Sequence, residues 1–197
     1  DLRMQNPYWI AYRNPRNTDK KRYMANVSIA FDILPWLNVS GRAKIDNTNS
    51  IFTQKLYASS NTTITEGSTQ GHYTEIRNTD EQIYADVMVN INKTFADNKF
   101  SLVANVGASV NDTKSKELSY RGPIREVGIP NMFTVFDLDK EKSRAQKYGW
   151  QEQTQSIFAS VEMGYKSMLY LTVTGRNDWA SQLAGSPQRS FFYPSVG

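Results

Sequence analysis

Few side chains in this sequence are of the types that build catalytic or metal-binding groups. It has no cysteine and one histidine, His72. These counts exclude disulfides, thiolate metal sites, cysteine nucleophiles and a histidine-rich metal site. His72 lies in a polar stretch that lacks the activated serine and the orienting carboxylate of a catalytic triad. We therefore expect an exposed loop histidine, no enzymatic activity and no cofactor.

Three acidic residues, Asp137, Asp139 and Glu141, alternate along one stretch and are of a type that can bind calcium. Their spacing lacks the central glycine and the distal bidentate glutamate of an EF-hand loop. We expect a solvated acidic loop and no metal site, with calcium in an oxygen-rich external loop as the alternative. A short helical turn is expected within residues 139–148.

The stronger pattern is an alternation of apolar and polar residues with period two, which predicts half-buried strands. Within residues 37–46, every odd-numbered residue is apolar or glycine, and every even-numbered residue is polar or charged. Each alternating stretch is about 10 residues long, the length that a tilted strand needs to cross a bilayer, whereas no run approaches the ~20 apolar residues of a spanning helix. The six stretches are residues 23–33, 37–46, 83–92, 100–111, 156–165 and 169–176, and residues 191–197 open a seventh.

The connections between these strands alternate between tight and long. Those after Ile33, Phe95 and Tyr165 take roughly two to four residues, as hairpins prefer. Those after Asp46 and Asn111 run to roughly 35 and 40 residues, part of which we expect to be strand extending beyond the apolar band. Short turns on one side and long loops on the other are typical of outer-membrane β-barrels. A soluble antiparallel sandwich shows the same alternation within its strands and stays an alternative.

The distribution of charge favours the barrel. The apolar face carries no charged residue in the six strands until Lys93, whose ammonium group can snorkel to a membrane interface. Aromatic residues collect near strand ends, as at barrel rims, although Phe158 and Tyr170 fall in the polar phase. A formal net charge of +4 over 197 residues does not favour nucleic-acid binding.

In a barrel, the first strand would run inward from the outside, so residues 1–20 would form an external loop. The densest basic run belongs to this part of the chain. We expect it to be a charged external loop, and contact with anionic lipid head groups is the alternative. The run consists of Arg13, Arg16, Lys20, Lys21 and Arg22.

The end of the sequence carries a more specific motif. Residues 169–179 read L-Y-L-T-V-T-G-R-N-D-W, and residues 191–197 read F-F-Y-P-S-V-G. This resembles the SusC/RagA-type TonB-dependent outer-membrane transporters, in which a strand ending in T-x-R-x-D-x-S-S leads through a short loop to a strand beginning Y-P-S. Ala180-Ser181 stands where the family has two small hydroxyl residues. The stretch N-P-Y-W at residues 6–9 and the stretch D-I-L-P-W-L at residues 32–37 also resemble the family.

The resemblance implies an all-β fold, an antiparallel transmembrane β-barrel segment of about six strands plus the start of a seventh, within a larger plugged barrel of roughly 22 strands. Residues 1–197 would be part of one TonB-dependent receptor β-barrel domain, without its plug, TonB box and remaining strands. Such a protein lies in the outer membrane of a Gram-negative bacterium and imports oligosaccharides or other nutrients such as peptides. Its implied partners are a SusD-like surface lipoprotein, TonB and outer-membrane lipid. The alternatives are a non-TonB porin or secretion pore, and a soluble β-sandwich that binds glycans.

Two sets of residues are candidates for contacts inside such a transporter. A polar wall that faces the lumen and packs against the plug is expected from Lys44, Asp86, Asn90, Asn105, Glu162 and Arg176. Aromatic rings stack on the C–H groups of sugars while polar groups bind hydroxyls. Substrate contacts are therefore expected from Trp9, Tyr12, Arg42, Tyr57, Tyr73, Tyr120 and Trp150, with interface anchoring or lipoprotein contact as the alternative for the rings.

Overall fold

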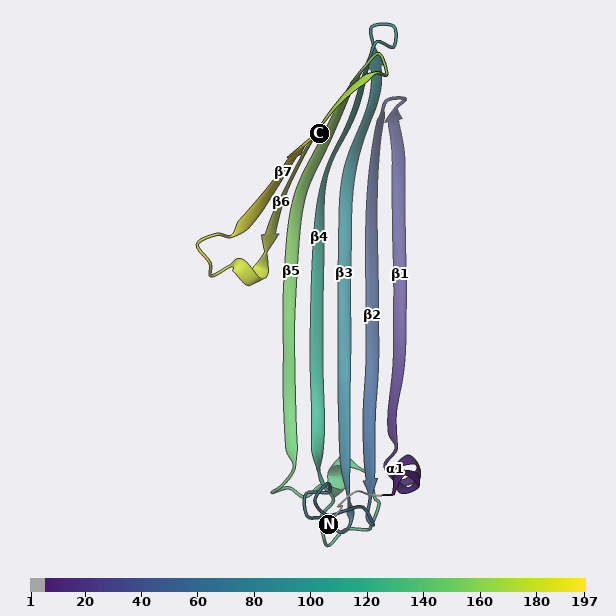
Figure 1. Ribbon diagram of the computed structural model, residues 1–197, viewed down its shortest axis with the longest axis vertical. Helices are drawn as coiled ribbons and strands as arrows, with labels where there is room; N and C mark the ends of the chain where they lie inside the picture. Colours follow the sequence, from purple (N-terminus) through teal and green to yellow (C-terminus); the bar gives the residue numbers. More distant parts are fainter. Residues whose placement is uncertain (1–5) are drawn as a thin grey trace. The chain divides into compact units, whose positions relative to one another are not determined.

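The computed structural model describes residues 6–197 as one antiparallel sheet of seven strands in the order β1-β2-β3-β4-β5-β6-β7, with β1 and β7 at its edges (Figure 1). Each strand therefore pairs with its neighbours in sequence, as the hairpin pattern predicts. The strands are β1 (Arg16–Leu34), β2 (Leu37–Tyr57), β3 (Gly71–Phe95), β4 (Phe100–Pro123), β5 (Arg144–Tyr165), β6 (Leu169–Ala180) and β7 (Ser190–Val196). The expected all-β class and the six strands with a seventh are confirmed.

Most strands continue well past the alternating stretches. β1 to β5 are 19 to 25 residues long, so residues 58–70 and 124–143 are all that remains of the two long connections. The extensions are rich in polar residues, for example Thr48, Asn49 and Ser50 of β2, and lack the regular alternation that predicts a strand. Backbone pairing with a neighbouring strand, which no local pattern reveals, keeps them extended.

The tight turns lie where the sequence predicts them. Residues 35–36 join β1 to β2, residues 96–99 join β3 to β4, and residues 166–168 join β5 to β6. Lys166 and Ser167 have φ angles of 50° and 55°, the left-handed conformation that two-residue hairpin turns require.

Two local expectations hold only in part. Residues 1–20 are expected to form a loop; residues 1–5 lie outside the described residues, and residues 6–20 contain α1 (Pro7–Arg13) and the start of β1. Asn6 caps α1 by accepting a hydrogen bond from the Tyr8 amide, and Pro7 occupies the first turn. The helical turn expected within residues 139–148 is confined to residues 139–143, where the Ser143 amide donates to the Asp139 carbonyl at 2.9 Å, and residues 144–148 belong to β5. The two 3₁₀ helices of the described residues are η1 (Val135–Asp137) and η2 (Ser181–Leu183).

The chain divides into two compact units, which share the long strands. Unit 2 consists of Tyr23–Asn47, Glu81–Lys114 and Gln151–Gly197. Its odd-numbered β1 residues are strongly exposed; Phe31 is 68% exposed and Val27 60%. In the described part of unit 2 the only buried apolar residue is Ala104, so this sheet has one apolar face without a second layer on it. A sandwich would bury that face in a core.

Unit 1 consists of Asp1–Arg22, Thr48–Asp80 and Ser115–Trp150, described from Asn6 onward. The two loops of this unit pack on each other around Ile124, which is 1% exposed. The Ile124 amide donates to the Gly71 carbonyl at 2.9 Å, and the Ser68 hydroxyl donates to the Ile124 carbonyl at 2.7 Å. Gly71 has a φ of +117°, and a Cβ there would lie 2.7 Å from the Leu56 carbonyl oxygen, so this close approach requires glycine.

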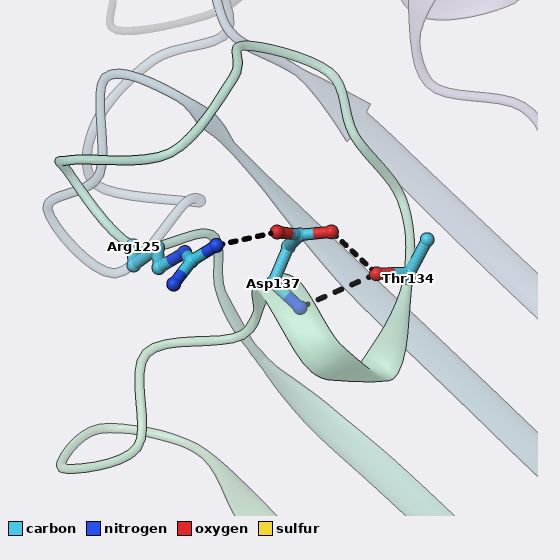
Figure 2. A network of polar contacts seen from close by, with 3 residues as sticks. All are labelled: Arg125, Thr134 and Asp137. Atoms are coloured by element: carbon cyan, nitrogen blue, oxygen red, sulfur yellow. Dashed lines mark hydrogen bonds and ion pairs between the residues drawn. The ribbon is translucent and has the colours of Figure 1, made fainter.

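A buried carboxylate organises the second loop of unit 1 (Figure 2). Asp137 receives hydrogen bonds from the Arg125 guanidinium at 3.0 Å and from the Thr134 hydroxyl at 2.5 Å. The Asp139 carboxylate accepts from the backbone amides of Glu141 and Lys142. The expectation of a solvated acidic loop is wrong for Asp137, which is 9% exposed, because its charge is compensated within the loop.

Within residues 6–197, no helix has the length and apolar character needed to cross a bilayer.

Candidate functional site

The polar face of unit 2 is held together by hydrogen bonds between neighbouring strands. The Arg42 Nε lies 2.9 Å and 3.2 Å from the two carboxylate oxygens of Asp86. The Asp86 side chain is 2% exposed, whereas that of Arg42 is 58% exposed. Asn90 donates to Asn38 at 3.1 Å, in the same phase of β2 and β3. The polar residues of this face therefore hydrogen-bond to one another, and the Arg42 guanidinium stays exposed to solvent.

A second cluster of the polar face lies on β5 and β6, at the T-x-R-x-D motif. Arg176 donates to Asp178 at 2.7 Å and to the Ser156 hydroxyl at 3.1 Å. Arg176 is paired across the sheet with Phe158 of β5 and with Tyr193 of β7. The arginine of the motif thus connects β6 to β5, and the spacing of two residues places the arginine and the aspartate on the same face of β6.

The two aromatic residues in the polar phase lie over glycines on adjacent strands. A Cβ built at Gly107 would be 2.6 Å from the Phe158 ring, and one built at Gly164 would be 2.9 Å from the Tyr170 ring. A ring that covers a glycine in this way replaces the missing side-chain contacts of that position. Phe158 and Tyr170 are therefore packing residues of the polar face.

The predicted lumen residues have the following positions. Lys44, Asp86, Asn90, Asn105, Glu162 and Arg176 all lie on β2 to β6 of unit 2, in the polar phase. The Lys44 ammonium lies 3.6 Å from Asp46, and the Thr172 hydroxyl lies 3.4 Å from Glu162. Asn105 lines a concavity with Phe158. Contact of these residues with a plug stays a prediction.

Aromatic residues and one lysine gather near the tight turns of the apolar phase. The Lys93 ammonium lies 4.7 Å from the centre of the Trp36 ring and 5.4 Å from that of Phe95. The rings of Phe100 and Tyr165 lie 5.0 Å apart. This arrangement has the composition of an interfacial girdle, with a cation that can reach the head groups.

Unit 1 contains a large concavity of about 1020 Å³. Its polar wall contains His72, Thr74 and Glu66, and Arg121 closes one side. The aliphatic side chains Ile10, Ala11, Pro15, Leu56 and Ile64 also line it, together with Asn14, Arg16, Gln54 and Asn61. The even-numbered β3 residues here continue the polar phase of unit 2 along the same strand.

His72 is buried, so the expectation of an exposed loop histidine is wrong. Its residue exposure is 5%, and its Nε2 lies 3.7 Å from a Glu66 carboxylate oxygen. Burial lowers the pKa of His72, an effect that the Glu66 carboxylate opposes and the Arg121 guanidinium reinforces. The imidazole is therefore neutral at pH 7. Its Nδ1 has no hydrogen-bond partner among the described residues.

A smaller concavity of about 130 Å³ also lies in unit 1. It shares Thr74 and Arg121 with the large one and adds Ile76, Glu117, Ser119, Arg144 and Gln146. Guanidinium groups on β4 and β5 therefore line one recess. The sequence pattern did not single out Arg121 and Arg144, since each is one of several scattered arginines and only strand pairing brings them together.

The opposite phase of unit 1 carries an aromatic cluster. The Phe133 ring lies 5.0 Å from Tyr57 and 6.2 Å from Tyr73, and the Arg13 guanidinium lies over both Trp9 and Tyr57. Three of the seven predicted substrate residues, Trp9, Tyr57 and Tyr73, are thus connected through Phe133 and Arg13. Phe133 has no signal in the sequence, and Arg13 is predicted only as part of the basic run.

Tyr73 anchors the polar end of this cluster. Its hydroxyl donates to Glu75 at 2.6 Å, and the Arg77 Nε donates to the other Glu75 oxygen at 2.6 Å. Burial raises the pKa of Tyr73, with the Glu75 carboxylate adding to the effect. Burial alone would raise the pKa of Glu75, but the hydrogen bonds from Tyr73 and Arg77 outweigh it and lower that pKa.

The other four predicted substrate residues do not join this cluster. Arg42 lies in unit 2. Tyr12 is on α1 and is 79% exposed, Tyr120 is on β4, and Trp150 is on β5 and is 40% exposed.

Comparison with known proteins identifies the fold. No protein-family model and no curated protein matches the sequence. The structure of the RagAB peptide transporter is similar to this chain, with a TM-score of 0.83, 18% sequence identity, and coverage of 98% of this chain and 21% of that chain. The RagAB peptide importer in its open-open state has a TM-score of 0.80 at 17% identity, covering 98% of this chain and 20% of that one.

A more distant match is BauA, the ferric preacinetobactin receptor of Acinetobacter baumannii. Its TM-score is 0.56 at 11% identity, with 93% of this chain and 28% of that chain covered. This chain spans about a fifth of the length of the RagAB structures. At these identities the likeness shows the fold alone: this chain has the fold of one segment of the β-barrel in the RagAB structures, the fold that the resemblance of the terminal motif implies.

Proposed function

We propose that this chain is a wall segment of a TonB-dependent outer-membrane transporter that imports an oligomeric nutrient. The observation that carries the proposal is the two-faced sheet of unit 2. One face exposes apolar side chains, and the other presents ion pairs such as Arg42–Asp86. A sheet with this division suits a wall between lipid and a wet or plugged lumen.

The open edges of the sheet support the same proposal. β1 and β7 each have a neighbouring strand on only one side. Unpaired backbone groups in hydrocarbon cost several kcal/mol each, roughly, so spanning sheets close on themselves. Further strands of the same protein would close this one into a complete barrel, in the outer membrane of a Gram-negative bacterium.

Transport without catalysis fits the chemistry of the polar face. The carboxylates of Asp86 and Asp178 are engaged by arginines, and Glu162 lies beside a threonine. The buried His72 faces Glu66 through Nε2, and no serine of the described residues hydrogen-bonds to its Nδ1. We infer a binding and conducting wall rather than an enzyme.

The partners and the substrate follow from the proposed transporter class. TonB would supply energy through a part of the protein outside this chain, and a SusD-like lipoprotein would cover the external side. Oligosaccharides and peptides are both candidate substrates. The rings of Trp9, Tyr57 and Phe133, which are half-buried, supply faces for sugar or lipoprotein contact, with the buried Tyr73 ring packed behind Phe133.

Two measurements on the full-length protein test the proposal. A folded barrel migrates anomalously on a detergent gel until it is boiled, and a soluble sandwich does not. Uptake of candidate peptides and oligosaccharides by cells should then stop when TonB is depleted or the proton gradient is collapsed. Uptake that continues unchanged without TonB would support a porin instead.

A further inference from the structure

The two concavities of unit 1 form one recess, which we call the arginine furrow. The larger concavity has a volume of about 1020 Å³ and the smaller about 130 Å³, and both are lined by Thr74 and Arg121. Arg16 lines the larger part and Arg144 the smaller. Three guanidinium groups, from β1, β4 and β5, therefore line one continuous recess.

The arginines of the furrow differ from the structural arginines of this chain. Arginines of the described residues that form ion pairs with aspartate or glutamate include Arg42, Arg77, Arg125 and Arg176. Arg121 and Arg144 make no such pair with any residue in the 6–197 range. With its amide oriented to accept, the Gln54 oxygen lies 3.2 Å from both Nε and Nη2 of Arg16. The Arg16 guanidinium therefore contacts a neutral amide and not a carboxylate.

The carboxylates of the furrow compensate its arginines only in part. Glu66 lies against His72, at 3.7 Å, and Glu117 lines the smaller concavity without an ion pair to an arginine. Three cationic groups therefore face two anionic ones, and the neutral His72 adds no charge. Such a recess attracts an anion, and the planar guanidinium fork matches a carboxylate in particular.

The remainder of the larger concavity favours a ligand with aliphatic parts. Ile10, Ala11 and Pro15 line it from α1 and the segment that follows, and Ile64 lines it from the loop. No aromatic side chain other than the imidazole of His72 is among its lining residues. Its volume is at the upper end of ordinary ligand sites, about 300–1,000 Å³, so it has room for several units of an oligomer.

We propose that the arginine furrow binds a carboxylate group of the imported substrate, with Arg121 as the central ligand and Arg144 beside it. This inference rests on the proposed transport function. Two kinds of oligomer carry the required group: a peptide, through its C-terminus or acidic side chains, and an acidic oligosaccharide, through its uronates. The shared chemistry is the carboxylate, and the probes below distinguish the two sources.

The test measures binding to the purified full-length protein by calorimetry. The probes are a neutral-side-chain octapeptide with a free C-terminus, the same peptide amidated, a hexagalacturonate and its methyl ester. We expect one free-acid probe to bind and its amidated or esterified form to bind about 10- to 100-fold more weakly, as for loss of a charge-assisted contact. The free-acid probe that binds identifies the source of the carboxylate.

The variants Arg121→Gln and Arg144→Gln should weaken binding of the free-acid probe by a similar factor, whereas Arg121→Lys should have an intermediate effect because it keeps the charge without the fork. The matched control is Arg77→Gln, which removes one arginine from the opposite phase of β3 and should leave binding unchanged. Heat-modifiable migration confirms that each variant is folded.

Two results would overturn the furrow site. One is that neither free-acid probe binds the wild-type protein; the other is that Arg121→Gln and Arg144→Gln bind a probe as tightly as wild type. TonB-dependent uptake can persist in either case, so failure of the furrow is distinguishable from failure of the transport proposal.

Discussion

The ion pair between Arg42 and Asp86 should respond asymmetrically to removal of its two partners. The carboxylate is 2% exposed, and the guanidinium is 58% exposed. Asp86→Asn leaves a cation that water already solvates, so only the charge-assisted part of the hydrogen bonds is lost. Arg42→Gln leaves a buried anion without its cation. The second change should therefore be the more damaging one.

The magnitudes follow from these exposures. Loss of a hydrogen-bonded pair whose remaining charge is wetted costs about 1 kcal/mol. Removal of the cation from a buried carboxylate costs about 3 kcal/mol, the lower end of the range for broken buried pairs, because the amide of the substituted glutamine can still donate one hydrogen bond. We expect the double variant to cost less than the sum of the two single changes, since no orphaned charge remains.

The assay is the unfolding of the full-length protein in detergent, followed as the loss of the compact band on a gel with increasing temperature. Arg42→Gln should lower the midpoint more than Asp86→Asn, and the double variant should recover part of the loss. Equal midpoints for the two single variants, or a larger effect from Asp86→Asn, would refute the assignment of Asp86 as the buried partner.

Three further predictions concern stability in the same assay. Gly71→Ala should destabilise the protein by about 1–3 kcal/mol, because it adds backbone strain and a clash of the new Cβ. Gly67→Ala should destabilise it less, because Gly67 has a φ of +90° but no atom within 4 Å of the added Cβ. Equal losses of stability in the two variants would contradict the clash at Gly71. Phe158→Ala should lower the free energy of unfolding by about 1–2 kcal/mol. In that background Gly107→Ala should be less harmful, because the Phe158 ring that the added Cβ would meet is gone. Additive losses of stability would argue against this contact. Burial lowers the pKa of His72, so below about pH 6.5 the unfolded chain binds more protons than the folded protein. The stability of the wild type should therefore fall as the pH drops below about 6.5, and His72→Phe should lessen that fall. A variant with the same pH profile as the wild type would exclude the histidine as its source.

Much of the fold could be predicted because strand geometry is local. Alternate residues of a strand point to opposite faces whatever the strand packs against, so the phase of β2 follows from residues 37–46 alone. Hairpins with short turns also pair consecutive strands, which makes the order of the sheet predictable. The three tight turns and the T-x-R-x-D motif lie where this reasoning puts them.

Strand ends and α1 could be predicted less well. The extension of β2 to Tyr57 has no regular alternation of apolar and polar residues, so pairing with its neighbour rather than its own pattern keeps it extended. α1 has a sequence signal in Asn6 and Pro7, an N-cap followed by a proline, but only seven residues, too few for a helical period to emerge.

The candidate sites were predictable as residue types but not as contacts. Aromatic residues near the predicted loops were recognised, yet Phe133 and Arg13, which join them, lie far apart in the sequence. His72 was expected on the surface because its neighbours are polar. It is buried because Glu66 and Arg121 converge on it from a loop and from another strand.

The sequence by itself therefore determined which face of unit 2 is apolar, where the chain turns tightly and which barrel class it resembles, since each of these depends on residues near in the chain. Only the tertiary structure decided which arginines are compensated and which are not. Arg42 lies close to Asp86 only once β2 and β3 pair, whereas Arg121 and Arg144 lie beside a recess. The physical reason is that an ion pair forms over about 4 Å, and only the register of strands and the packing of loops bring distant residues within that range.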